Sequence, residues 1–133
     1  MELTPELKKI MRESTFQVIE GTFVYAKVSK VPDGRHFMIT QDKDEITVVT
    51  EENKLSELDA IEKNKDERRL IALHVPVPFY SVGFLATISG AIAEAGMNVL
   101  IVSTYSKDYI MVKKDLLPKA KQILLSLDFR ESV

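Results

Sequence analysis

Residues 81–106 constrain the fold and function of this chain more than any other segment. They read SVGFLATISGAIAEAGMNVLIVSTYS: a polar loop, an amphipathic helix that ends near Gly96, and a strand with a hydroxyl-rich exit. Gly96 stands where a helix takes a left-handed residue just past its end. The apolar stripe of this helix has three- and four-residue spacing and consists of Val82, Leu85, Ile88, Ile92 and Ala95. This order of elements predicts a small pocket of backbone amides at the start of the helix.

Such a pocket suits the head group of a small metabolite. The first amides of a helix lack partners and carry partial positive charge, so a carboxylate placed there gains hydrogen bonds. Ser81 would cap the helix or bind the ligand, and Gly83 would let the ligand approach the backbone closely. Phe79 and Phe84 would form apolar walls, and Phe84 lies off the stripe, so we expect its ring to face a second module. Across that interface Asn98 would present its amide.

The alternative is that the loop only caps its helix and that both phenylalanines belong to an ordinary core. Loops of this kind occur in every α/β sandwich. The loop chemistry alone leaves both interpretations open.

Apolar periodicity elsewhere predicts an α+β chain. Thr4 and Pro5 are typical of a helix start. Gly21 separates two expected strands, and a charged segment follows a short helix in the middle of the chain. The expected strands are 16–19, 22–29, 36–40, 45–50, 69–75, 98–104 and 109–113, with a short helix near 55–61, a last helix at 116–127 and a short edge strand at 128–130.

The second half therefore reads βαββα with a closing strand, which is the ferredoxin-like arrangement of an antiparallel sheet with helices on one face. A weak repeat, T-x-x-K-D-x-I-x-V, recurs at an offset of 64 residues, at 40–48 and 104–112. It suggests a duplication. We expect two ferredoxin-like βαββαβ modules: a degenerate one at 1–66 and a complete one at 67–133. The charged run 62–69 would be the linker.

Composition argues against several classes of function. The chain has 133 residues, 45% hydrophobic and 29% charged, with a net charge of −2 and no cysteine. Mixed charges without a basic stripe argue against nucleic acid or an anionic membrane as partner. There is no thiol for a disulfide or a thiolate metal site. Neither a signal peptide nor an apolar run of membrane-spanning length is present, so we expect a cytoplasmic protein.

Catalytic signatures are weak. His36 and His74 are the only histidines; His74 sits in a strand pattern, and His36 borders a turn where we expect it to be solvated. Two histidines without carboxylates at ligand spacing do not predict a metal site. No nucleophile elbow, P-loop or dinucleotide fingerprint is present. We expect no enzyme activity, no catalytic residue, no metal and no cofactor.

The stretch from Val77 to Asp115 resembles an ACT domain, above all the regulatory modules of aspartate kinases. The resemblance rests on Gly83-Phe84-Leu85-Ala86, on Ala95-Gly96-Met97-Asn98-Val99 and on Ile101-Val102-Ser103-Thr104. The first half is similar to the degenerate first module of small stand-alone tandem ACT proteins.

The resemblance implies a ligand class and a site. ACT modules pair side by side and bind amino acids where they meet. The positions carried over to this chain are Phe79, Ser81, Val82, Gly83, Phe84, Leu85, Asn98 and Val99. Leu100 stands where some amino-acid-binding modules have an aspartate, and Tyr105 replaces a serine common in the kinase modules. Kinase activity is not carried over.

We therefore expect a regulatory module that binds an amino acid between modules and acts as a homodimer or on a partner enzyme. The alternative is a structural module that dimerises through its sheet and has a vestigial ligand site.

Overall fold

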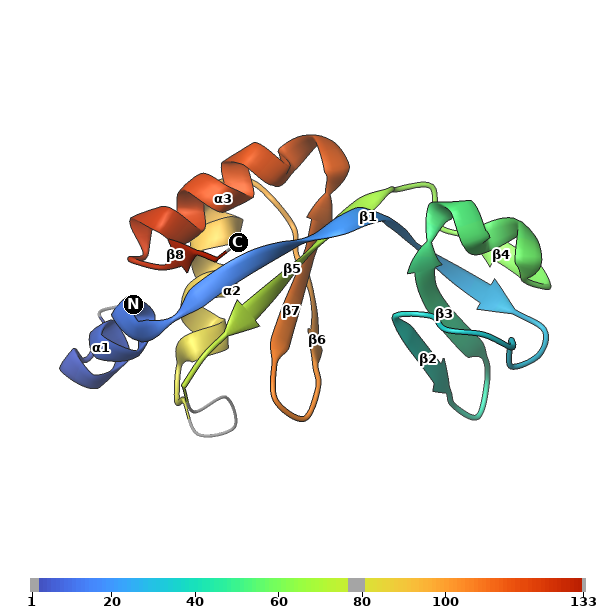
Figure 1. Ribbon diagram of the computed structural model, residues 1–133, viewed down its shortest axis with the longest axis horizontal. Coiled ribbons are helices and arrows are strands. Elements are labelled where there is room, and N and C mark those ends of the chain that lie inside the picture. Colours follow the sequence, from blue (N-terminus) through green and yellow to red (C-terminus); the bar gives the residue numbers. More distant parts are fainter. Residues whose placement is uncertain (1–2, 77–80, 133) are drawn as a thin grey trace.

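The computed structural model describes residues 3–76 and 81–132 (Figure 1). Within these residues, three α-helices, two short 3-10 helices and eight strands follow one another. In order, they are α1 (Pro5–Glu13), β1 (Thr15–Val28), β2 (Met38–Gln41), β3 (Ile46–Glu51), η1 (Glu52–Glu57), β4 (Ala60–Lys63), β5 (Arg68–His74), α2 (Phe84–Glu94), β6 (Leu100–Ser103), β7 (Asp108–Lys113), η2 (Lys114–Leu116), α3 (Leu117–Ser126) and β8 (Arg130–Glu131).

All the strands belong to one sheet, whose main path is β2-β3-β1-β5-β7-β6. The central strand β1 pairs through its first half with β5 and, in parallel, with β8. Its second half pairs with β3 and β4. Figure 1 shows the three α-helices gathered around one end of β1, and β2, β3 and β4 around the other. The sheet is therefore continuous across the middle of the chain.

Gly21 does not separate two strands as the sequence analysis expected. It lies within β1, which is 14 residues long. Ile19 pairs with Leu70, and Phe23 pairs with Arg68. Between these two pairs, residues 20–22 of β1 lie opposite the single residue Arg69 of β5. Gly21 lies in this bulge with φ of +106°, a value that residues with a side chain disfavour.

The charged run 62–69 is not a linker. Its first part belongs to β4, where Lys63 pairs with Ala26 and Glu62 with Lys27. Its last part starts β5. All four residues of β4 are exposed, and long charged side chains suit such a strand because they remain in water. The short helix before it also lies earlier than expected, as η1.

Both hairpins form as expected. The turn between β2 and β3 closes through Asp42 N–H to Glu45 O, and the turn between β6 and β7 through Thr104 N–H to Lys107 O. These turns are 62 residues apart, so the T-x-x-K-D pattern at offset 64 does not align them residue by residue. Thr4 caps α1 through a 3.1 Å bond from Leu7 N–H, as predicted.

Gly96 ends α2 in the predicted left-handed conformation, with φ of +78°. Its N–H donates to Ala93 O, and the N–H of Met97 donates to Ile92 O. These two bonds are those of a Schellman motif, and the buried side chains of Met97 and Ile92 complete it. The motif turns the chain from α2 toward β6.

The main core lies between the helices and one face of the sheet. Leu7 and Met11 enter it from α1, and Phe16 enters it from β1. The larger contributions come from α2, α3 and the strands β5 and β7, through Phe84, Ile88, Ile92, Ala120, Leu124, Ile71, Leu73, Ile110 and Val112.

A second apolar cluster lies on the opposite, helix-free face of the sheet. Along β5 the side chain of Leu70 belongs to this second cluster and that of Ile71 to the main core, as alternation along a strand requires. Phe23, Val49 and Met111 complete its buried part, and Phe37 packs against it from the loop before β2. This cluster spans both halves of the chain.

The boundary between residues 66 and 67 stays a prediction. Strand β1 begins far before that boundary, yet it pairs with β5 and β8 beyond it. Within the described residues, no helix is long and apolar enough to cross a membrane.

Candidate functional site

Helix α2 begins with Gly83 as its N-cap, not with Ser81 as expected. Gly83 has φ of +82°, and its carbonyl accepts the N–H of Thr87 at 3.0 Å and the Thr87 hydroxyl at 2.8 Å. The Ser81 carbonyl accepts the N–H of Phe84 at 3.2 Å. Gly83, as the N-cap, has no side chain with which to cap the first turn of α2. The glycine is required here by conformation, before any question of ligand access.

The predicted site residues around this helix start have different environments. Val82 is 92% exposed, so it does not belong to the apolar stripe of α2. Phe84 is 1% exposed and its ring centroid lies 5.8 Å from that of Phe129. The prediction that Phe84 faces a second module is therefore wrong; it is a core residue. Leu85 is half-buried against the core, and Phe79 lies outside the described residues.

Asn98 and Val99 lie at the other end of α2. Asn98 is exposed, and Val99 packs partly against the main core. Because β5 and β6 both run antiparallel to β7, the helix between them starts at one end of the sheet and finishes at the other. The 11 residues of α2 span about 16 Å. The structure thus does not bring Asn98 and Val99 together with Ser81–Leu85 within one copy of the chain.

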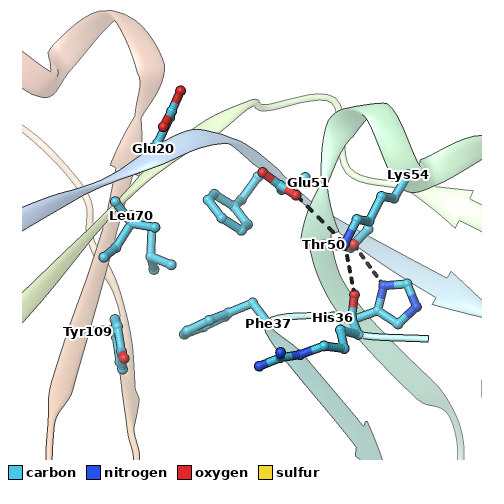
Figure 2. Close-up of a pocket in the computed structure, with 11 residues that line it drawn as sticks. Glu20, His36, Phe37, Thr50, Glu51, Lys54, Leu70 and Tyr109 are labelled. Carbon is cyan, nitrogen blue, oxygen red and sulfur yellow. Dashed lines mark hydrogen bonds and ion pairs between the residues drawn. The ribbon is translucent and has the colours of Figure 1, made fainter.

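A cavity of about 330 Å³ lies elsewhere, on the helix-free face where the two ends of the sheet meet. We call it the junction cavity. Figure 2 shows residues from both ends of the molecule around it, including Leu70 and Tyr109 on one side and His36, Thr50 and Lys54 on the other. Its lining consists of Ile19, Glu20, Phe23, Arg35, His36, Phe37, Thr50, Glu51, Lys54, Leu70 and Tyr109.

His36 is not solvated as expected but is half-buried and held from both ring nitrogens. Its Nε2 lies 2.9 Å from the Asp33 carbonyl oxygen, which only accepts, so Nε2 carries a proton. Its Nδ1 lies 2.8 Å from Thr50 Oγ1 and accepts that hydroxyl when the ring is neutral. These bonds fix the loop that leads into Phe37.

Lys54 lies between two acceptors on the same side of the junction cavity. Its Nζ is 3.2 Å from the Arg35 carbonyl oxygen and 3.8 Å from Glu51 Oε2 (Figure 2). Through these contacts η1, the end of β3 and the loop before β2 form one polar wall.

Sequence reasoning missed the junction cavity because its lining comes from β1, the loop before β2, β3, η1, β5 and β7. No local spacing links those segments. The one local signal was Gly21 inside a strand pattern, which is typical of a bulge or of close approach by another group.

The acidic turn at 42–45 has a structural role. Asp42 Oδ1 accepts the N–H groups of Asp44 and Glu45 at 2.8 and 3.1 Å, which stabilises the hairpin turn. Among the described residues, no group of three or more histidine, aspartate or glutamate side chains could hold a metal ion.

Comparison with solved structures gives two similar chains of almost the same length. A protein of unknown function and possible transport protein from Vibrio cholerae has a TM-score of 0.76 at 21% identity, over 92% of this chain and 96% of that chain. A protein from Agobacterium tumefaciens has a TM-score of 0.68 at 20% identity, over 90% and 92%. These TM-scores show a shared fold.

The regulatory subunit of aspartate kinase from Thermus thermophilus, in its ligand-free form, has a TM-score of 0.60 at 10% identity. The match covers 86% of this chain and 95% of that subunit. No curated protein sequence matches the chain. The family model of the ACT domain matches residues 65–126. Residues 65–126 thus match the ACT-domain family model, and the fold of the chain is shared with the regulatory part of aspartate kinases.

Proposed function

We propose that this protein is a regulatory ACT-domain protein, not an enzyme, and that it binds a small amino acid where two modules meet. The observation that carries the proposal is the separation of Ser81–Leu85 from Asn98 and Val99 by the length of α2. Each end of α2 supplies half of the expected site, so a complete site requires a second module.

The edge of the sheet supports this pairing. Strand β6 ends the strand order, and its side chains from Leu100 to Val102 are half-exposed. A twofold axis perpendicular to the sheet would pair two β6 strands in antiparallel fashion. Because α2 runs antiparallel to β6, that axis would place the start of one α2 beside Asn98 of the other copy. The backbone amides of the first turn of α2 would then face the amide of Asn98, and both suit a carboxylate.

We also infer that the first half is a second module without the two long helices. Around the second half of β1 the strands are ordered β4-β1-β3-β2. Around β5 the order is β1-β5-β7-β6. In the first order, the hairpin β2-β3 follows β1 along the chain, and β3 pairs with β1. In the second, the hairpin β6-β7 follows β5 in the same way, and β7 pairs with β5. The loop after β1 and η1 replace the helices of the complete module.

A thermal-shift screen with each of the twenty amino acids tests the proposal, with sedimentation velocity on any that responds. A ligand that binds only the folded protein raises its melting temperature by several degrees at saturating concentration. If the site lies between copies, ligand and dimerisation strengthen each other reciprocally. Asn98→Ala should weaken binding at least about tenfold, or about 1.4 kcal/mol. Asn53→Ala, which alters another exposed asparagine, should leave it unchanged.

The alternative is a structural module that dimerises through its sheet, with a vestigial ligand site. The half-exposed apolar side chains of β6 favour it. Under this alternative the protein dimerises equally with and without amino acids, and the thermal screen is flat.

A further inference from the structure

We propose that the junction cavity is a second ligand site, for a small molecule with an apolar or aromatic body and one carboxylate group. It lies within one copy of the chain, on the helix-free face of the sheet, and does not depend on pairing through β6. Amino acids with apolar side chains and the corresponding acids without an amino group share this chemistry.

The floor and one wall of the junction cavity are apolar. Ile19 and Leu70 pair across β1 and β5, and Leu70 is fully buried. Phe37 covers them from the loop before β2: its ring centroid lies 4.9 Å from that of Tyr109 and 6.2 Å from that of Phe23, both in edge-on geometry. A wall of this composition favours an aromatic or branched apolar group, and 330 Å³ is the size of a small-metabolite site.

The polar wall opposite holds two cations, Lys54 and Arg35, together with the carboxylate of Glu51. The ammonium of Lys54 is held by the Arg35 carbonyl and by Glu51, so its charge is partly compensated. The guanidinium of Arg35 has no hydrogen-bond or ion-pair partner among residues 3–76 and 81–132, although Arg35 lines the cavity. Glu20 also lines the cavity, but Figure 2 shows its carboxylate directed away from the other labelled side chains. An unpaired guanidinium beside an apolar hollow is suited to a carboxylate, which it binds with two parallel hydrogen bonds.

The backbone around the junction cavity is adapted to hold this wall. At the β1 bulge, a Cβ atom on Gly21 would stand 2.8 Å from Glu51 Oε1, so any other residue would displace the Glu51 carboxylate from this position. Glu51 in turn positions Lys54, and the bonds of His36 to Thr50 and Asp33 position Arg35 and Phe37. Bulges with this effect occur often beside functional sites.

Isothermal titration calorimetry of the full chain tests the proposal with three probes: L-phenylalanine, 3-phenylpropionate and 2-phenylethylamine. One or both carboxylate probes should bind, and the amine without a carboxylate should bind at least about tenfold more weakly. Binding of both carboxylates alike identifies the carboxylate as the recognised group, and a preference for L-phenylalanine identifies an amino acid as the ligand. The proposal is overturned if the amine binds as tightly as the acids, or if no probe binds up to about 5 mM.

Arg35→Met should weaken the carboxylate probes at least about tenfold and leave the melting temperature unchanged, because Arg35 is exposed and unpaired. Arg12→Met, which removes an exposed arginine from the last turn of α1, is the matched control and should bind as the parent does. Asn98→Ala separates this site from the one proposed between copies. If Asn98→Ala abolishes binding of L-phenylalanine and Arg35→Met preserves it, the ligand sits between copies and the junction cavity is not its site.

Discussion

The carboxylate of Glu51 occupies the space that a side chain on Gly21 would need, with Oε1 at 2.8 Å from the position of a Cβ atom. The φ of +106° at Gly21 disfavours a side chain independently of that clash. The backbone conformation is the stronger of the two requirements for glycine at this residue of β1, because the Glu51 side chain can move aside.

Gly21→Ala should destabilise the protein by about 1–3 kcal/mol, as expected for a residue forced into left-handed backbone. Urea unfolding followed by circular dichroism measures the change. The added mutation Glu51→Ala should recover little of the loss, because the Glu51 side chain can move away from the new methyl group and the backbone strain remains. Gly90→Ala is the control: it lies within α2 with nothing within 4 Å of its Cβ position, and should stabilise by about 0.5–1 kcal/mol. Equal effects at both glycines would contradict the argument.

Phe84→Ala should lower the free energy of unfolding by about 3–5 kcal/mol, because it leaves a cavity beside Phe129 in the main core. Val82→Ala, two residues earlier but 92% exposed, should stay within about 0.5 kcal/mol of the parent. Chemical denaturation of both variants decides the matter. If Phe84→Ala were as stable as the parent but bound ligand more weakly, Phe84 would be a ligand-contacting residue and not a core residue.

The stability of the protein should fall in alkali through Tyr25. Burial raises the pKa of the Tyr25 phenol above its ordinary 10.0, and the charge of Arg68 offsets part of that rise. The folded state then holds the phenolic proton more firmly than the unfolded state. The contribution to stability is complete below pH 10.0 and is lost as the pH rises from there through the raised pKa.

Urea unfolding at pH 9 and above, up to about pH 11, measures this loss. Tyr25→Phe has no phenolic proton, so its stability should decline less steeply over the same range. A decline equal to that of the parent would assign the alkaline instability to other groups.

A fragment of residues 67–133 tests the boundary between the halves. It lacks β1, so β5 loses its neighbour on one side and the core loses Phe16. We expect the fragment to show a broad, noncooperative thermal transition, whereas residues 14–133, which keep β1, should melt cooperatively. A cooperative transition in the shorter fragment would make 67–133 an independent domain.

Several elements could be predicted from sequence because their signals are local. Thr4 at the start of α1, Gly96 after α2 and the two hairpin turns each rely on residues a few positions apart. The family resemblance over the second half was confirmed for the same reason, since its motifs surround one helix.

Other features depend on distant partners. The charged residues of β4 form a strand only because β1 provides hydrogen bonds, and propensity alone favours a linker there. Phe84 lay off a stripe that included Val82, but the left-handed Gly83 starts the helix two residues later than expected and leaves Val82 outside it. The junction cavity needs six segments to meet, and no single window of sequence contains that information.

The sharing of β1 between both ends of the sheet has an evolutionary consequence. If the chain arose by duplication, one copy could lose its helices because the common strand kept it hydrogen-bonded to the intact copy. The same strand prevents recombination from separating the two copies, since a crossover on either side of it deprives one of them of a strand. Under such a duplication the two copies would be inherited as a unit.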